Sequence, residues 1–515
     1  MNLFQAICGN NSSSTAIIHG QRRMTYDELR AETLSVAQAL TLLGVQQGDR
    51  VALLLHDSPE FVTAFIATCS LGAIAVPINM GLRPDEQRLI LNNSGARLTI
   101  VEVDICNTLL TDASERLPDL KDIVVIERGA KTAFRALGDV QREAASSDLP
   151  EFVTPDEDQP AFILYTSGST GDPKGAVHTQ AHIFYTNETF CREVLGVNKA
   201  DRLFSSSRLP FAYGLGNGFS FPLLNGATSI LCSEKPTPDA VCRVFEESRP
   251  TIFFGVPVVY NLLLDHHRRG NKLDCSSLRL CVSAGEALPA HLGEEWESEF
   301  GVPVVDGIGS TEMLHMFMSN HQDDVRYGSS GKVLDGYKAR LLNEEGDTVE
   351  QGEGNLWIKG GSAALGYWEK PEETERNFVN GWVRTGDLYR RDNDGYWFHM
   401  GRSDDCFKSS GRWVSPVEVE GVLIRHAKVS KAAVVADFDA DGLPCACAFV
   451  VCQDVESETE EIEKELNELA AATLPRFKRP RRYIFVDDLP YTATGKVQRF
   501  KLRERLRRRT EGVAE

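Results

Sequence analysis

One stretch of the chain, from Tyr165 to Thr179, gathers the residue types that bind phosphate. Its sequence, YTSGSTGDPKGAVHT, combines glycines with five Ser or Thr hydroxyls and one lysine. Glycine lets backbone N–H groups approach an anion closely, hydroxyls add neutral donors, and Lys174 adds a positive charge. We therefore predict a phosphate-binding loop, whose candidate ligands are Thr166, Ser167, Gly168, Ser169, Thr170, Gly171 and Lys174.

The spacing within this stretch allows more than one interpretation. The P-loop pattern G-x-x-x-x-G-K-[ST] is absent, because Lys174 is followed by glycine and alanine. A segment rich in Gly and Ser is otherwise often a flexible surface linker. Here the apolar run 161–164 predicts a buried strand before the loop, and Pro173 and Lys174 interrupt the simple composition. These features favour a phosphate loop of another type.

The composition is that of a globular protein with a large negative charge. The chain has 515 residues, so we expect more than one domain, and its 42% hydrophobic content suffices for sizeable cores. The formal net charge of -19 argues against nucleic-acid binding. Any anionic ligand must therefore meet locally positive sites.

The cysteines and apolar segments predict neither zinc binding nor a membrane span. The twelve cysteines form no zinc-type pair of C-x-x-C motifs, so we expect reduced thiols. The N-terminal MNLFQAICGNNSSS lacks the basic start and long apolar core of a signal peptide. The most apolar later stretch, 64–78, is too short to cross a bilayer. We therefore expect a cytoplasmic protein.

Helix-like and strand-like segments alternate through the first part of the chain. Thr25 and Glu28 have the spacing of a capping box and predict a helix that ends near Gly44. The pattern continues with strands at 51–55, 73–78 and 98–103 and with helices from about Pro59 and at 83–94. This alternation predicts an α/β fold with mainly parallel sheets covered on both faces. The acidic stretch 127–160 is expected to be a surface connection, and 251–260 a strand followed by a turn.

The sequence pattern changes near Gly401. A strand at 354–359 and the hairpin-like run RRDNDGYWFHMG precede this point, and a unit of about a hundred residues follows it. We predict a large N-terminal α/β domain at 1–401 and a small, mobile α+β domain at 402–515. The latter holds an acidic amphipathic helix at 458–474 and a basic segment at 476–509, with 13 Lys or Arg against 3 Asp or Glu. The basic segment is either a solvated surface or a contact for a polyphosphate ligand.

Further segments match, in order, the motifs of one enzyme superfamily. They are SAGEAL from Ser283, DGIGSTE from Asp306, WVRTGDL from Trp382, GRSDD from Gly401 and TATGKVQRFKL from Thr492. Together with the glycine-rich loop, they make nearly the whole chain resemble the adenylate-forming superfamily. That superfamily contains acyl-CoA and aryl-CoA ligases, adenylation domains of peptide synthetases, and firefly luciferase.

The resemblance implies an ATP site built from these segments. Glu312 would bind Mg2+, Thr311 would lie near the phosphates, and Asp387 and Arg402 would contact the ribose. The residues implied to surround the rest of the nucleotide are Gly285, Glu286, Ala287, Asp306, Gly307, Ile308, Gly309 and Ser310. Taken singly, Glu312 would be a solvated carboxylate, Asp387 a turn residue, and Arg402 a surface partner of nearby aspartates. The order of the motifs favours the functional roles.

The C-terminal motif implies a mobile catalytic lysine. A lysine near a basic tail is ordinarily solvent-exposed, but Lys496 follows a Thr-Gly turn that can present it on a loop. The resemblance implies that Lys496 bridges the substrate carboxylate and the α-phosphate, with Lys174 as a helper. Asp404 lies at the position of the family's hinge. The alternative interpretation is that Asp404 is an ordinary exposed residue in a turn. Rotation about the hinge would withdraw Lys496 and bring Ser410, Gly411, Arg412 and Trp413 to a thiol tunnel.

The implied reaction follows from the chemistry of carboxylates. Oxide is a poor leaving group, so a carboxylate must first attack the α-phosphorus of ATP and release pyrophosphate. The resulting acyl adenylate then reacts with the thiolate of coenzyme A, and AMP leaves. Several anionic groups meet in the first step, so the site needs Mg2+ and fixed positive donors rather than a protein nucleophile.

Three segments resemble benzoate-CoA ligase and related aryl-CoA ligases more closely than the superfamily at large. They are PFAYGLGNGFSFPLL from Pro210, SAGEALP from Ser283 and GIGSTEMLHMFMSN from Gly307. By position, Ala212, Tyr213, Gly309, His315 and Met316 would line the acid pocket. Met316 departs from the branched aliphatic residue common in that branch, so ring substituents or a larger acid stay open. His315 is either a hydrogen-bonded core histidine or a contact to a substrate hydroxyl.

The same motifs are compatible with other functions. An enzyme that loads a carrier-protein thiol would share every ATP motif, and the basic segment at 476–509 only mildly favours coenzyme A. An oxygenase of the luciferase kind and a non-catalytic nucleotide-binding regulator are further alternatives, and Lys496 and Glu312 argue against the regulator. The expected partners are a small carboxylic acid, ATP and coenzyme A, in a monomer or homodimer.

Overall fold

The computed structural model describes residues 1–9, 12–110, 117–126, 133–166, 173–439, 442–453, 459–491 and 497–510. By internal contacts the chain divides into two compact units. Unit 1 comprises Met1–Ala339 and Ile358–Val383, and unit 2 comprises Arg340–Trp357 and Arg384–Glu515. This division falls within three strands, β17 (Lys338–Leu342), β19 (Gly352–Lys359) and β21 (Trp382–Arg391), rather than after Gly401. The mobile domain predicted at 402–515 therefore stays a prediction.

The first part of unit 1 alternates strands and helices as the sequence predicts. The strands are β3 (Arg50–Leu54), β4 (Ile74–Pro77), β5 (Leu98–Glu102), β6 (Asp122–Ile126), β7 (Arg135–Ala136), β8 (Pro160–Thr166) and β9 (Lys174–Thr179). The helices are α1 (Leu3–Cys8), α2 (Tyr26–Leu42), α3 (Pro59–Ser70), α4 (Pro84–Ser94), α5 (Val103–Leu110) and α6 (Leu137–Ala144). Thr25 and Glu28 form the predicted capping box of α2, and Gly44 follows that helix with φ +72°.

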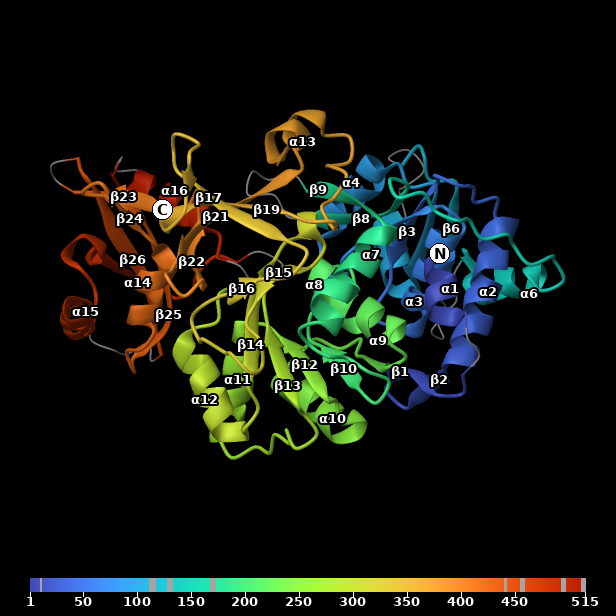
Figure 1. Ribbon diagram of the computed structural model, residues 1–515, viewed down its shortest axis with the longest axis horizontal. Helices are drawn as coiled ribbons and strands as arrows, with labels where there is room; N and C mark the ends of the chain where they lie inside the picture. The colour runs from blue at the N-terminus through green and yellow to red at the C-terminus, as the bar shows by residue number, and fades with distance from the viewer. Residues whose placement is uncertain are drawn as a thin grey trace. The chain divides into compact units, whose positions relative to one another are not determined.

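These strands form a seven-stranded sheet in the order β7-β6-β5-β3-β4-β8-β9. Neighbouring strands run parallel, except that β8 and β9 pair antiparallel. The helices α1, α2, α3 and α6 pack together beside the sheet (Figure 1). The prediction that 127–160 is only a surface connection is wrong in one respect. The helix α6 lies within this stretch and buries Leu137 and Val140 in the core.

A nine-stranded sheet forms the rest of unit 1. Its strands are β1 (Thr15–His19), β2 (Arg22–Thr25), β10 (Arg202–Ser205), β11 (Thr228–Leu231), β12 (Ile252–Gly255), β13 (Leu280–Ser283), β14 (Val304–Gly309), β15 (Met316–Ser319) and β16 (Lys332–Val333). Their order is β16-β15-β14-β13-β12-β10-β11-β1-β2, with a parallel centre and antiparallel edges. Every residue of β12 and β13 is buried, as expected for strands covered on both faces.

Helices and helical turns connect the strands of this second sheet. They are α7 (Gln180–Thr186), α8 (Ala212–Leu215), α9 (Phe221–Leu224), α10 (Pro238–Ser248), α11 (Pro257–Arg268), α12 (Ala290–Phe300) and the π-helical turns η2 (Asn187–Arg192) and η3 (Gly216–Ser220). The last helix of unit 1, α13 (Pro371–Asn377), instead lies between β19 and the short strand β20 (Phe378–Val379) of another sheet. The helices α10, α11 and α12 pack against one face through large side chains such as Phe245, Tyr260 and Trp296. The turn expected after the strand in 251–260 is wrong, since α11 begins there with Pro257 at its first position.

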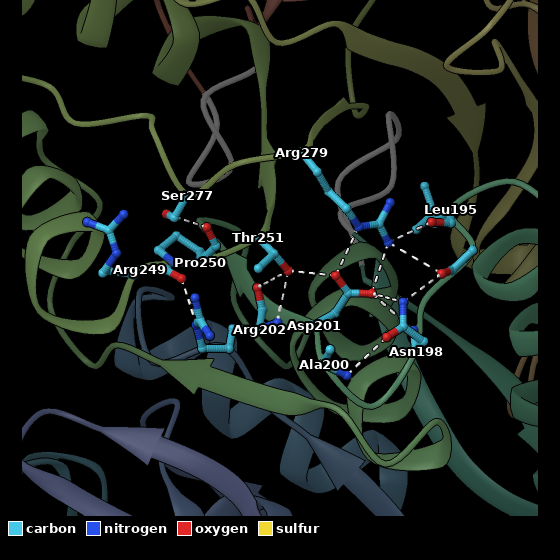
Figure 2. Close-up of polar contacts among 11 residues, drawn as sticks. Leu195, Asn198, Ala200, Asp201, Arg202, Arg249, Pro250, Thr251, Ser277 and Arg279 are labelled. Atoms are coloured by element: carbon cyan, nitrogen blue, oxygen red, sulfur yellow. Dashed lines mark hydrogen bonds and ion pairs between the residues drawn. The ribbon is translucent and has the colours of Figure 1, made fainter.

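A polar network fixes the amino edge of the nine-stranded sheet (Figure 2). Asp201, Thr251 and Arg279 directly precede the adjacent strands β10, β12 and β13. The carboxylate of Asp201 accepts hydrogen bonds from Nε and Nη2 of Arg279 at 2.9 Å and from Oγ1 of Thr251 at 2.8 Å. Ligands of parallel α/β sheets bind at the carboxyl ends of the strands, which form the edge opposite this network.

Unit 2 is built mainly from antiparallel hairpins and one small sheet. Its elements are β17 (Lys338–Leu342, which starts in unit 1), β18 (Thr348–Val349), β22 (Trp397–Arg402), β23 (Phe407–Ser409), β24 (Arg412–Val414), α14 (Pro416–Leu423), β25 (Val429–Phe438), β26 (Pro444–Cys452), α15 (Thr459–Thr473), β27 (Pro480–Phe485) and α16 (Arg499–Thr510), besides parts of β19 and β21. The sheet β25-β26-β27 packs one face on α14 and α15 and the other on α16. The cysteines form no disulfide among the described residues, and most of them are buried.

Candidate active site

The predicted phosphate loop joins two neighbouring, antiparallel strands. Thr166 at the end of β8 and Lys174 at the start of β9 are register partners, so both residues lie at the base of the loop. The remaining predicted ligands, Ser167 to Gly171, lie outside the described residues. The structure therefore positions the two ends of the loop, and the phosphate contacts within it stay predicted.

The segment that holds Thr311 and Glu312 follows the carboxyl end of β14. A single 3-10 turn spans Thr311–Met313 and is capped by the Ser310 hydroxyl, which accepts a hydrogen bond from the N–H of Met313 at 3.2 Å. The carbonyl oxygen of Thr311 accepts a hydrogen bond from Nε2 of the buried His178 on β9 at 2.8 Å. The turn is thus attached directly to the strand that begins with Lys174.

A third segment, 364–368, lies against both of these parts. Its backbone pairs with β9 through N–H groups of Leu365 and Trp368, which donate to Val177 and Gly175 at 2.9 and 2.7 Å. The N–H of Ala364 donates to the carbonyl oxygen of Glu312 at 2.7 Å. The loop base, the Glu312 turn and this segment therefore form one connected backbone frame.

Glu312 has the chemistry that a magnesium site requires. A carboxylate is a hard oxygen ligand, and Mg2+ is commonly held by one or two carboxylates together with substrate phosphates and water. Among the described residues, no group of three or more His, Cys, Asp or Glu side chains is arranged to hold a metal ion. Oε1 of Glu312 accepts a hydrogen bond from the Tyr367 hydroxyl at 2.7 Å. A single oriented carboxylate is what we expect for a metal ion that arrives with the nucleotide. A metal held by the protein alone would need several such ligands.

The predicted adenine turn and Asp306 lie side by side at the carboxyl edge of the sheet. Gly285, Glu286 and Ala287 follow β13, and Gly285 has φ +89°, which favours glycine. The N–H of Leu288 directs a long hydrogen bond of 3.5 Å to Oδ2 of Asp306 on the parallel neighbour β14. Burial raises the pKa of Asp306 well above its ordinary value.

The pairing of β14 with β15 explains the glycines of the DGIGSTE segment. A Cβ atom on Gly309 would lie 2.5 Å from the carbonyl oxygen of His315, and one on Gly307 would lie 2.5 Å from that of Met318. Neither strand can yield without losing the antiparallel ladder in which Gly309 faces Met316. Gly307, Ile308 and Gly309 thus bring the nucleotide segment and the predicted acid pocket into direct contact.

Aromatic side chains, among them the predicted acid-pocket residue Tyr213, surround His315. The ring centroid of Tyr213 lies 5.6 Å from that of His315, and the rings of Phe221 and Phe190 lie 4.6 and 5.2 Å away. Nε2 of His315 lies 3.2 Å from Oδ1 of Asn217. Burial lowers the pKa of His315 to about 3, so its imidazole is neutral. Ala212 precedes Tyr213 on α8, and Met316 begins β15.

In unit 2, Asp387 and Arg402 face each other across the β21–β22 hairpin. They are register partners, and Nη1 of Arg402 lies 3.3 Å from Oδ1 of Asp387. Nε of Arg402 also lies 3.8 Å from Oδ1 of Asp404, whose side chain is exposed. Arg402 therefore contacts the neighbouring Asp404, as the structural interpretation predicts. It contacts Asp387, the predicted ribose ligand, at the same time.

The predicted thiol-tunnel residues form the tip of the β23–β24 hairpin. Ser410 and Gly411 both have positive φ, +53° and +73°, which is the geometry of a two-residue I′ hairpin turn. The guanidinium carbon of Arg412 lies 4.1 Å from the ring centroid of Phe477, and Nζ of Lys408 lies 5.1 Å from that of Trp413. A cleft of about 260 Å³ is lined by Glu353, Lys408, Gly411, Arg412, Trp413, Phe477 and Lys478. The predicted catalytic Lys496 lies outside the described residues.

Comparison with known families agrees with this arrangement. The chain matches the family described as AMP-binding enzyme over residues 4–368 and the AMP-binding enzyme C-terminal domain over residues 418–496. The chain belongs to the AMP-binding enzyme family. The predicted membership of the adenylate-forming enzymes is thereby confirmed.

This AMP-binding enzyme is similar to aryl-CoA ligases over nearly its whole length. It is 41% identical over 508 residues to the benzoate–CoA ligase of Thauera aromatica, covering 96% of this chain and 94% of the relative. It is 38% identical over 491 residues to the 4-hydroxybenzoate–CoA/benzoate–CoA ligase of Rhodopseudomonas palustris, covering 95% and 90%. A solved anthranilate CoA ligase in complex with anthranoyl-AMP superposes with a TM-score of 0.91 at 37% identity, covering 98% and 97%. No helix within the described ranges has the length and apolar character that a membrane span needs.

Sequence reasoning missed three residues of this AMP-binding enzyme's site. Tyr367 contacts both Lys174 and Glu312, Asn217 contacts His315, and His178 contacts Thr311. A weak signal existed for each, because His178 closes the glycine-rich segment and Asn217 lies within PFAYGLGNGFSFPLL. Tyr367 lies in GYWEKPEET, whose charged residues are mostly acidic and therefore do not indicate a phosphate contact.

Proposed function

We propose that this AMP-binding enzyme is an ATP-dependent ligase that joins a benzoate-like aromatic acid to coenzyme A, releasing AMP and pyrophosphate. The observation that carries the proposal is its end-to-end similarity to ligases named for benzoate and hydroxybenzoate. The position of Tyr213 beside His315, whose imidazole is neutral, supports the same conclusion.

In the first step, a carboxylate oxygen of the acid attacks the α-phosphorus of ATP, and the bond to pyrophosphate breaks. Lys496 bridges the carboxylate and the α-phosphate and offsets the charge that develops between them. Thr311, Lys174 and the glycine-rich loop hold the pyrophosphate leaving group. Mg2+, held by Glu312, supplies positive charge to the phosphate oxygens when it is bound.

The resemblance assigns nucleotide contacts to two sets of residues, one at the carboxyl edge of the nine-stranded sheet and one on the β21–β22 hairpin of unit 2. Gly285 to Ala287 and Asp306 to Ser310 border the adenine and its ribose. Asp387 accepts hydrogen bonds from the ribose hydroxyls, and Arg402, which lies 3.3 Å from that carboxylate, contacts the phosphate side. These roles come from the resemblance and are compatible with the observed backbone geometry.

The acid pocket favours an uncharged aromatic ring. Tyr213, Phe221 and Met316 offer ring and thioether contacts, and His315 is neutral. A second carboxylate on the substrate would find no positive charge among these side chains and would pay the cost of burial. Benzoate and its hydroxyl or amino derivatives therefore fit this group of side chains better than a dicarboxylic acid.

In the second step, the thiolate of coenzyme A attacks the acyl carbonyl and AMP leaves. The cleft at the tip of the β23–β24 hairpin has three cationic side chains, Lys408, Arg412 and Lys478, beside the rings of Trp413 and Phe477. Such a surface suits the phosphates and adenine of coenzyme A. The thiol of a carrier protein is the alternative acceptor. Such an acceptor would need no contacts to the phosphates and adenine of coenzyme A.

A panel of acids tests the proposal. Pyrophosphate release is measured with benzoate, the hydroxybenzoates, 2-aminobenzoate and medium-chain fatty acids, each with and without coenzyme A. We expect an aromatic acid to react fastest and coenzyme A to convert a single turnover into continuous turnover. A preference for fatty acids would contradict the aromatic substrate class. Absence of thioester with coenzyme A, with adenylate still formed, would favour the carrier-protein alternative.

A further inference from the structure

Tyr367 lies between two residues that the proposed reaction assigns to the phosphates. Its hydroxyl donates a hydrogen bond of 2.7 Å to Oε1 of Glu312. The ammonium group of Lys174 lies 5.6 Å from the centroid of the same ring. One side chain therefore contacts both the proposed magnesium ligand and the lysine at the base of the phosphate loop.

The orientation of this ring is fixed by groups other than Lys174 and Glu312. The N–H of Tyr367 donates to Oγ1 of Thr374 on α13 at 2.9 Å, and the ring packs edge to face on Phe378 with centroids 5.4 Å apart. Gly366 has φ +142°, and a Cβ atom there would lie 2.6 Å from Cγ2 of Thr374. Tyr367 also forms a bridge with Ala176 of β9. The tyrosine is thus an anchored support for the two charged side chains.

A carboxylate that binds a metal needs a defined orientation. Hydrogen bonds to ligating carboxylates fix which oxygen faces the metal, and loss of such an outer contact typically weakens metal binding about 10–100-fold. We propose that Tyr367 is a positioning residue for the nucleotide–metal complex: its hydroxyl holds Oε1 of Glu312, which leaves Oε2 for Mg2+, and its ring supports Lys174. This inference rests on the proposed role of Glu312 in binding Mg2+.

The two contacts of Tyr367 can be separated by substitution. Tyr367→Phe removes the hydroxyl and keeps the ring, so of these two contacts it removes only the hydrogen bond to Glu312. Tyr367→Leu removes both the hydroxyl and the aromatic face beneath Lys174. The first change should alter the response to Mg2+ alone, whereas the second should also weaken the binding of phosphate without metal.

The experiment measures binding of β,γ-methylene-ATP to the full chain by calorimetry, with saturating Mg2+ and with EDTA. In the unaltered chain we expect Mg2+ to tighten binding. For Tyr367→Phe we expect that gain to fall about tenfold while the affinity in EDTA stays unchanged. For Tyr367→Leu we expect the same loss and, in addition, a several-fold weaker affinity in EDTA.

Tyr327→Phe is the matched control, because it removes a tyrosine hydroxyl that donates to a carboxylate oxygen of Glu297 at a similar distance, 2.8 Å, at a different place. It should leave both affinities unchanged, whereas Glu312→Gln should abolish the gain from Mg2+. An undiminished gain in Tyr367→Phe would overturn the inference, and so would an equal loss with and without metal. The binding readout does not depend on which acid reacts, so failure of the acid panel would contradict the proposed function and leave this test intact.

Discussion

Arg279 donates hydrogen bonds to both carboxylate oxygens of Asp201, from Nε to Oδ1 and from Nη2 to Oδ2, each at 2.9 Å. Figure 2 shows the side chain of Asn198 and the hydroxyl of Thr251 directed at the same carboxylate. Burial alone would raise the pKa of Asp201, but the hydrogen bonds from Arg279, Asn198 and Thr251 outweigh burial and lower that pKa. The network joins the starts of three adjacent strands, on the edge of the sheet opposite the nucleotide segments.

We expect Asp201→Asn to lower the free energy of unfolding by about 2 kcal/mol at pH 7, because the partly buried Arg279 loses its charged partner. The pKa of Asp201 is lowered on folding, so its contribution is complete above the unfolded pKa of about 3.8 and is lost as pH falls through the folded value. The difference between the two proteins should therefore shrink below about pH 4.

Urea unfolding at pH 7 and at pH 3.5 checks this expectation. Asp265→Asn is the control, since Asp265 pairs with Arg268 at 2.8 Å on the exposed side of α11 and should change stability by less than about 0.5 kcal/mol. An equal loss in both variants at pH 7, or a gap that widens in acid, would show that the Asp201 network does not act as described.

The secondary structure that could be predicted from the sequence depends on residues close together in the chain. The capping box of α2 needs only Thr25 and Glu28, three positions apart, and the β21–β22 hairpin is indicated by the local run RRDNDGYWFHMG. The order of the motifs along the chain likewise indicates the family without any knowledge of the fold. Local chemistry therefore predicted the elements, and the resemblance supplied the residues of the candidate site, whose roles stay predictions.

The missed features depend on contacts between distant residues. Tyr367 meets Glu312 across 55 positions, and Asn217 meets His315 across 98, so neither pairing has a local signal. The helix α11 was missed for a different reason. Its first residues, PVVY, favour a strand by β-branching, while Pro257 at the first helical position favours a helix start, and the packing of Tyr260 and Leu263 in the core decides the outcome.

The π-helical turn η3 offers a specific test of the acid pocket. A Cβ atom on Gly216 would lie 2.5 Å from Cδ2 of His315 and 3.1 Å from Cζ of Phe221. Gly216→Ala should therefore displace the imidazole, break its hydrogen bond with Asn217 and lower kcat/KM for an aromatic acid at least about tenfold. The KM for ATP should change much less, because the added atom meets the side chains of His315 and Phe221 and not the nucleotide segments.

Gly218→Ala, in the same turn, is the control. Its added Cβ atom would lie 3.1 Å from Cδ2 of Leu209, away from the histidine, so the flexible leucine can absorb the change. Steady-state kinetics with benzoate and with ATP distinguish the two variants. If Gly216→Ala kept its activity towards every acid in the panel, His315 would be a core residue rather than part of the acid pocket.

Asp404 offers a test of the predicted hinge. Among the described residues, its backbone N–H donates no backbone hydrogen bond, whereas those of Asp405 and Cys406 both donate to the carbonyl oxygen of Arg402. Asp404→Pro therefore restricts backbone rotation without removing such a bond. We expect it to spare adenylation and to slow thioester formation from preformed acyl adenylate about tenfold or more. Asp404→Ala, which keeps rotation, should be near normal in both half-reactions, and an equal loss of both in Asp404→Pro would count against a hinge.

The relative importance of the two lysines can be tested by the same half-reactions. Lys174 begins β9 at the base of the loop and lies over the ring of Tyr367, which suits a residue that steadies the β- and γ-phosphates. Lys496 is proposed to bridge the attacking carboxylate and the α-phosphate, where charge develops in the transition state. Loss of a group that stabilises developing charge costs about 100–1000-fold in rate, so Lys496→Ala should slow ATP–pyrophosphate exchange at least that much and Lys174→Ala roughly tenfold. Thioester formation from preformed acyl adenylate should be retained in both variants, since pyrophosphate has already left. A larger loss of exchange in Lys174→Ala than in Lys496→Ala would reverse the ranking and make the loop lysine the principal cation of the adenylation step.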